Sequence, residues 1–205
     1  MRRIFAARFI LVPALLIAGA LPASADSASP AQSMTHMKSA PGIAKTLAGA
    51  GVVLYAQGGA TAGVMGDSIA DAKGQVVFHI PITANKAGVQ HTGSNIVLFN
   101  TTNNKQVQLR NPVIDLTKGV VTAVVPQVGT EAITVLNISN LATLKPKSST
   151  DRAAGVRSRT FAGASLNFAP SIASTVATLL GLPSGSLPDG ALFATADVTL
   201  KKRVR

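Results

Sequence analysis

The sequence predicts a mostly β protein: an antiparallel β-sandwich, immunoglobulin-like in general architecture, with one short helix near residues 171–180. Short runs rich in β-branched residues recur from Gly51 onward, separated by segments rich in turn-forming residues. These segments are too short to hold the crossover helices that parallel strands require. One run, Lys105 to Arg110, alternates polar with apolar residues, which is typical of a strand with one face in solvent.

Seven runs are predicted as strands: Val52 to Gln57, Gln75 to Ile82, Ile96 to Asn100, Lys105 to Arg110, Val113 to Leu116, Val120 to Val125, and Ala132 to Ile138. In the alternating run we expect Val107 and Leu109 to face the core and the polar residues, Gln108 among them, to face solvent. Asn103-Asn104 favours a hairpin turn before this run, because Asn tolerates the left-handed conformation.

The C-terminal third predicts a basic loop, a helix and a closing strand. Residues 145–159 scatter Lys and Arg among Ser, Thr, Gly and Ala, which favours a mobile loop. Apolar residues at helical spacing from Ile172 to Leu180 follow Ser171, a candidate N-cap, and precede Gly181, a helix stop. Ala191 to Leu200 alternates as a strand, and the basic residues 201–205 read as a solvated tail.

The first 25 residues have the order of a cleavable secretory signal peptide. Arg2, Arg3 and Arg8 are followed by an apolar stretch, and the small residues 23–25 suit signal peptidase. We therefore expect an exported protein, located outside the cell or in its envelope, with the general secretory and twin-arginine routes both open. Residues 26–45 are expected to be a flexible lead-in, with His36 in solvent, and residues 46–205 a single domain.

The charge of the chain and its lack of cysteine indicate which classes of partner and which covalent attachments to expect. Three of the 19 basic residues leave with the signal peptide, yet the others still outnumber the eight acidic residues by two to one. In an exported protein such charge favours an anionic polymer of the cell envelope. Nucleic acid is not expected, because aromatic residues for base stacking are scarce. The sequence has no Cys, so neither a lipid anchor on cysteine nor a disulfide is expected. No transmembrane anchor is expected in the mature chain. The oligomeric state stays open.

Catalytic motifs are not found in the sequence. The mature chain has His36, His79 and His91 as its only histidines and no Cys, and it contains no nucleophile elbow, phosphate loop or zinc-protease motif. Asp67 and Asp71 match no calcium loop and are expected to be solvated turn acids, so neither a catalytic nor a metal site is predicted. His79 is expected on the strand face opposite its apolar neighbours.

Three segments together resemble a known family. Residues 78–82 (FHIPI), 88–93 (GVQHTG) and 109–116 (LRNPVIDL) are similar, in this order, to the HtaA-type domain of bacterial secreted and surface proteins. The resemblance covers about residues 48–200. It implies a β-sandwich with short accessory helices.

The resemblance also implies a cofactor, because some members of that family bind haem through an axial Tyr supported by a His. Tyr55-Ala56-Gln57-Gly58 resembles the ligand step, and His91 falls in the matching His turn. The expected function is an exported, non-enzymatic binding or structural module of the envelope or exterior, without a cofactor. The alternative is a haem-binding protein that uses Tyr55 and His91, and a secreted hydrolase comes third.

Overall fold

A computed structural model describes residues 32–64 and 74–204 of the chain. The predicted signal peptide, Asp67 and Asp71 lie outside the described residues. Two α-helices and one short 3-10 helix accompany the strands: α1 (Ile43–Gly49), α2 (Ile172–Leu180) and η1 (Leu141–Thr143). The strands are β1 (Met34–Ser39), β2 (Val52–Gly58), β3 (Thr61–Gly63), β4 (Val77–Pro81), β5 (Val89–Gln90), β6 (Ser94–Asn100), β7 (Lys105–Asp115), β8 (Val120–Val124), β9 (Ala132–Ile138), β10 (Lys147–Asp151), β11 (Val156–Phe168) and β12 (Leu192–Arg203).

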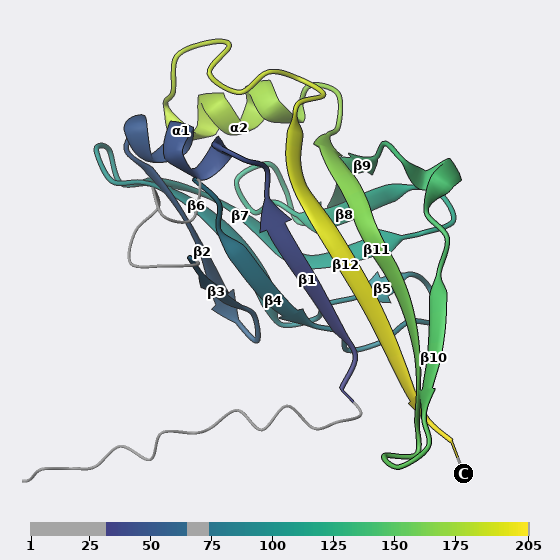
Figure 1. Cartoon of the computed structure of the whole chain (residues 1–205). Coiled ribbons are helices and arrows are strands. Elements are labelled where there is room, and N and C mark those ends of the chain that lie inside the picture. The colour runs from purple at the N-terminus through teal and green to yellow at the C-terminus, as the bar shows by residue number, and fades with distance from the viewer. Residues whose placement is uncertain (1–31, 65–73, 205) are drawn as a thin grey trace, which may run out of the picture.

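The strands form one 12-stranded antiparallel sheet that curls until it is nearly closed. Neighbouring strands follow the order β2-β6-β7-β8-β9-β11-β12-β1-β4-β3, while β5 pairs with β7 and β10 with β11. The two ends of this order, β2 and β3, are joined by the short turn Gly59-Ala60 and lie side by side. Both helices lie at one end of the curled sheet, at the top of Figure 1. No helix of the described part is long and apolar enough to cross a membrane.

The core lies inside the curled sheet and is built from side chains on its inner face. On β12, Phe193, Ala196 and Val198 are buried, and Val107 and Leu109 of β7, expected to face the core, belong to the same buried cluster. Because side chains have to fill the interior of a curled sheet, most strands turn alternate residues toward it, whereas β3 and β10 are exposed throughout.

The predicted fold class is confirmed: the protein is mostly β, antiparallel, and has a short helix at Ile172–Leu180. Gly181 ends this helix in the left-handed conformation (φ 70°). Ser171 stands at the N-cap position, and its backbone carbonyl accepts from Thr175 N at 3.0 Å. Its side chain makes no capping hydrogen bond. The hairpin between β6 and β7 turns at Asn104, which has a φ of 59°.

The flexible lead-in predicted for residues 26–45 is wrong where the structure describes it. Residues 34–39 form β1, which lies between β12 and β4 in the sheet, and α1 begins at Ile43. The physical reason is an alternation of buried and exposed residues: Thr35, Met37 and Ser39 are buried, while the residues between them are exposed. The linker-like composition of this segment conceals the alternation, because two of its three buried residues are polar. His36 is exposed as predicted, but on a strand.

Three further expectations are corrected. Residues 145–159 are not a loop, because most of them form the hairpin of β10 and β11. Residues 201–203 of the predicted solvated tail belong to β12, where they pair with residues 156–158. The runs 105–110 and 113–116 form the single strand β7. Gln108, on the outer face of β7, is only 6% exposed, because the Arg110 side chain packs beside it and Arg110 Nε donates to the Gln108 side chain.

Candidate functional site

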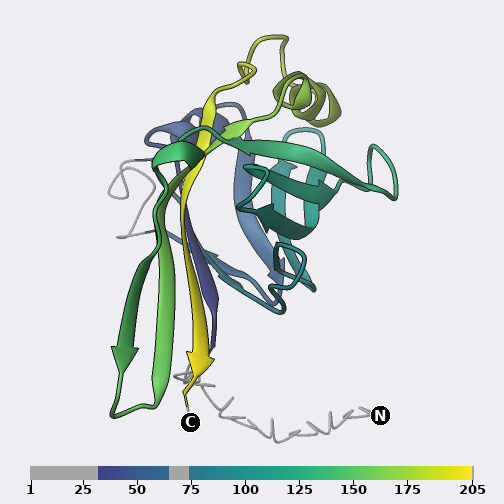
Figure 2. The same cartoon turned by 90° about the vertical axis from the view of Figure 1, so that its right-hand side faces the viewer.

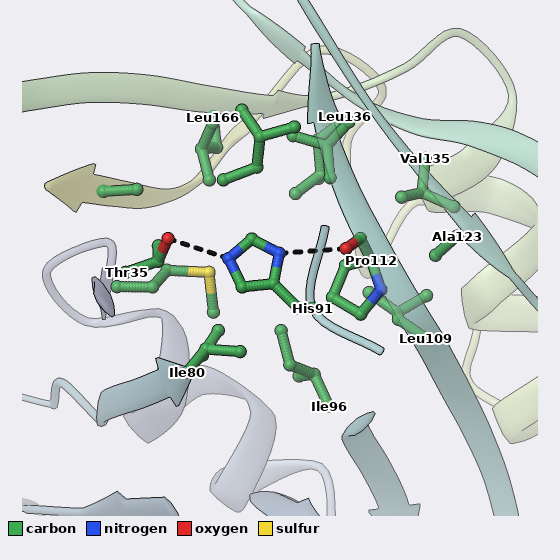
Figure 3. A pocket seen from close by; sticks show the side chains of 14 residues that line it. Thr35, Ile80, His91, Ile96, Leu109, Pro112, Ala123, Val135, Leu136 and Leu166 are labelled. Atoms are coloured by element: carbon green, nitrogen blue, oxygen red, sulfur yellow. Dashed lines mark hydrogen bonds between the residues drawn. The ribbon is translucent and has the colours of Figure 1, made fainter. Parts of the chain in front are cut away.

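His91 lies inside the curled sheet, between β5 and β6, and both its ring nitrogens have partners (Figure 3). Pro112 O lies 2.9 Å from Nδ1, and Thr35 Oγ1 lies 2.8 Å from Nε2. A carbonyl oxygen can only accept, so Nδ1 carries the proton and donates to Pro112. In a neutral ring Nε2 is then unprotonated, and it accepts a hydrogen bond from the Thr35 hydroxyl. The imidazole therefore joins β1 to β7 across the interior.

The sequence around Pro112 explains why its carbonyl is free to accept. β7 changes register between Arg110 and Val113, and Asn111 at this irregularity has a φ of 50°. Proline, which lacks an N–H, is tolerated in a sheet at such a bulge. The freed Pro112 carbonyl accepts from the backbone N–H of His91 at 3.0 Å as well as from its ring.

The surroundings of His91 keep its ring neutral. Burial lowers its pKa below the ordinary value of 6.5, while the hydrogen bond to Pro112 partly opposes this shift. The adjoining cavity has a volume of about 20 Å³, room for about one water, and its lining is mainly aliphatic, as Ile80, Ile96 and Leu109 illustrate. His91 is thus a structural group of the core.

Tyr55 lies on the opposite side of the sheet from His91. In β2, Leu54 and Ala56 pack against the core, so Tyr55 between them points outward, beside its cross-strand partner Val97. The phenol is half-buried, its hydroxyl lies 3.5 Å from Gln57 Nε2, and it lines an open depression of about 350 Å³ beside α1 and β3. The structure therefore does not bring Tyr55 and His91 together.

The residues present do not fit a Tyr–His haem site. The His91 nitrogens are occupied inside the sheet, and the Tyr55 phenol faces outward, so His91 cannot support a phenolate ligand at that position. Haem binding itself stays a prediction.

A second feature is an arm of the sheet that extends beyond the core. The ends of β10, β11 and β12 project past the other strands at the lower left of Figure 2. We call residues 147–160 and 199–203 the basic arm. It carries one acidic residue, Asp151, whose Oδ1 accepts from Ala154 N at 2.9 Å. Its cations are Lys147, Arg152, Arg157, Arg159, Lys201, Lys202 and Arg203.

Within the arm, cations share one face without an acidic partner. Arg157 of β11 and Lys202 of β12 lie directly opposite each other, both exposed. Arg159 is two residues further along the same face, with its guanidinium 5.0 Å from the ring centroid of Phe161. In the described part of the chain the one ion pair, Lys118–Asp115 at 3.9 Å, lies elsewhere.

The sequence showed the charge of this arm but not its geometry. The alternation of Arg157 and Arg159 with smaller residues is a strand signal that the neighbouring Gly and Ala residues masked. The pairing of Arg157 with Lys202 depends on the register between β11 and β12, which no local pattern contains.

Comparison with known proteins finds no matching family model, no matching curated protein and no matching solved structure. The resemblance to the HtaA-type domain therefore stays a prediction, and the geometry of the site has to support any functional proposal.

Proposed function

We propose that this protein is an exported, non-enzymatic module that binds an anionic polymer of the cell envelope through the basic arm. The observation that carries the proposal is the pair Arg157 and Lys202, two cations held opposite each other on adjacent strands and forming no ion pair with an acid of the described residues. Like charges directly opposite in a sheet are destabilising, with their Cβ atoms about 4.5–5.5 Å apart. A bound anion between them removes this repulsion.

The chemistry of the arm suits phosphate or carboxylate groups. A guanidinium offers a planar fork of donors that matches both anions, and the arm has four arginines. Contact with the Phe161 ring orients Arg159 before any ligand arrives. Residues on one face of a strand recur at about 6.6 Å, so Arg157 and Arg159 present charges at a regular interval to a repeating polymer.

The position of the arm supports the same conclusion. It extends away from the core, so a long chain can reach its faces without entering the domain (Figure 2). At an exported location the abundant polyanions are envelope polymers, which is the partner class expected from the net charge.

The experiment is a binding titration with purified poly(glycerol phosphate). The double variant Arg157→Gln/Lys202→Gln removes two charges from the arm, and the matched control Lys45→Gln/Lys86→Gln removes two exposed charges from elsewhere. Each Lys or Arg near an anionic surface contributes roughly 1 kcal/mol, so we expect the arm variant to bind about 30-fold more weakly. The control should lose much less, and salt should weaken the native affinity. Equal losses in the two variants would mean that only net charge matters and would refute the arm as the binding site.

A further inference from the structure

His36 and His79 form a pair on the outer face of the sheet, and the function proposed above uses neither of them. His36 of β1 lies directly opposite His79 of β4, and both side chains are exposed. Their Nδ1 atoms lie 2.8 Å apart, and their rings meet edge to face with centroids 4.7 Å apart. The pairing of β1 with β4 thus holds two imidazole nitrogens close together.

The hydrogen bond between the two rings shows that they are not both charged. One Nδ1 has to carry a proton and the other has to be bare in order to accept it. Burial, and then the neighbouring His79, lower the pKa of His36 below its ordinary value of 6.5, while Asp197 opposes this and Lys201 adds to it. Neutral imidazole is the form that binds metal ions, and the ring whose Nδ1 accepts this hydrogen bond already presents an unprotonated nitrogen.

We propose that His36 and His79 together bind a divalent transition metal ion, with Cu²⁺ preferred. Imidazole nitrogens bind such ions at about 2.0–2.1 Å, so two nitrogens at a right angle around the metal lie about 2.9 Å apart. A tetrahedral site needs about 3.3 Å, and the two Nδ1 atoms, 2.8 Å apart on exposed rings, are close enough to reach one ion in either geometry once the rings turn. Square-planar or tetragonal coordination by nitrogen is typical of Cu²⁺, which is also the tightest-binding ion of the first-row divalent series.

The surrounding groups define what completes the coordination. Asp197 lies opposite His36 on β12, but its Oδ1 already accepts from Gly163 N at 2.7 Å. The described part of the chain contains no group of three or more His, Cys, Asp or Glu residues able to hold a metal. Within the described residues the nitrogen ligands are therefore the two histidines, while the second oxygen of Asp197 and water are available for the other positions, and the site opens to solvent. The site forms when the two exposed rings turn and the Nδ1 proton moves to Nε2 of the same ring, which stays neutral.

The experiment titrates the untagged protein with Cu²⁺ and follows binding by electron paramagnetic resonance. We expect one ion per chain, with nitrogen hyperfine structure from two imidazoles. His36→Gln and His79→Gln should each weaken binding by more than about tenfold, since loss of even an outer-shell partner lowers metal affinity about 10- to 100-fold. Lys38→Gln is the matched control, because Lys38 is the next exposed residue of β1 and should leave the affinity unchanged.

Three results would overturn the proposal: unchanged affinity in either histidine variant, coupling to fewer than two imidazoles, or tighter binding of Zn²⁺ than of Cu²⁺. If a histidine variant does not fold, NMR of the unsubstituted protein still tests the site. Substoichiometric Cu²⁺ should broaden the amide NMR signals of His36 and His79 before those of His91, and broadening centred elsewhere would also reject the site. The variant Arg157→Gln/Lys202→Gln leaves His36, His79 and their charged neighbours Asp197 and Lys201 unchanged, so the two proposals fail independently.

Discussion

Acid should destabilise this protein through His91. The folded state lowers the pKa of His91 below the ordinary value of 6.5, with burial as the main cause. The unfolded chain therefore binds a proton near pH 6.5, whereas the folded chain binds it only at lower pH. The stabilising contribution is fully present above pH 6.5 and is lost as the pH falls from 6.5 toward the lower pKa of the folded state.

The structure sets the size of this effect. Among the described residues no carboxylate lines the cavity beside His91, so none of them compensates a charged ring. A proton that binds only the unfolded chain changes the free energy of unfolding by at most about 1.4 kcal/mol per pH unit. Between pH 7 and pH 5 the contribution of His91 is therefore at most about 2 kcal/mol. Carboxylates titrate mainly below this range and add little to it.

The assay is urea unfolding followed by far-UV circular dichroism at several pH values from 7.5 to 5. The reference is the double variant Thr35→Val/His91→Leu, which replaces both side-chain partners by apolar groups that suit the aliphatic lining. Pro112 O keeps its bond from the backbone of residue 91. His36, whose pKa is also lowered, is present in both proteins, so the difference between them isolates His91. If the two proteins lose stability in parallel on acidification, His91 is not the buried neutral group described above.

Two further substitutions test the packing around this histidine. Thr35→Val alone should lower the free energy of unfolding by about 1–3 kcal/mol in urea unfolding, because Nε2 of His91 stays buried without its donor, and an unchanged value would contradict the hydrogen bond. Gly58→Ala should reduce the melting temperature strongly, because Gly58 has a φ of +71° and an added Cβ would overlap the carbonyl oxygen of Gly93. Gly63→Ala is the control for it, since open space surrounds Gly63, and equal effects of the two substitutions would refute the steric argument.

The sequence predicted those elements whose signals are local. The helix Ile172–Leu180 has apolar residues at helical spacing and ends at Gly181, and both features act within a few residues. The first half of β7 is predicted because Val107 and Leu109 alternate with polar residues, whereas its continuation beyond Asn111 is predicted as a separate strand. β1 was missed because its composition resembles that of a linker, although Thr35 and Met37 occupy alternate buried positions between two long-range partner strands.

The candidate sites could not be predicted in the same way because each depends on strand register. His36 and His79 are 43 residues apart, and only the pairing of β1 with β4 makes them neighbours. His91 was predicted in a turn, which is correct, but its burial depends on the bulge of β7 that turns the Pro112 carbonyl toward it. Sequence motifs report short-range patterns, whereas these contacts come from tertiary structure.

The packing of the interior limits where a ligand can bind. The cavity beside His91 holds about 20 Å³, whereas sites for small molecules typically have about 300–1,000 Å³. Opening such a volume would expose or displace core side chains, at a free-energy cost comparable to the whole stability of a small domain. A ligand of this core would therefore have to unfold it, and recognition falls to the outer surface. There the chain gathers seven cations on the arm and places its two exposed histidines on adjacent strands, which is why both proposals concern the outside of the sheet.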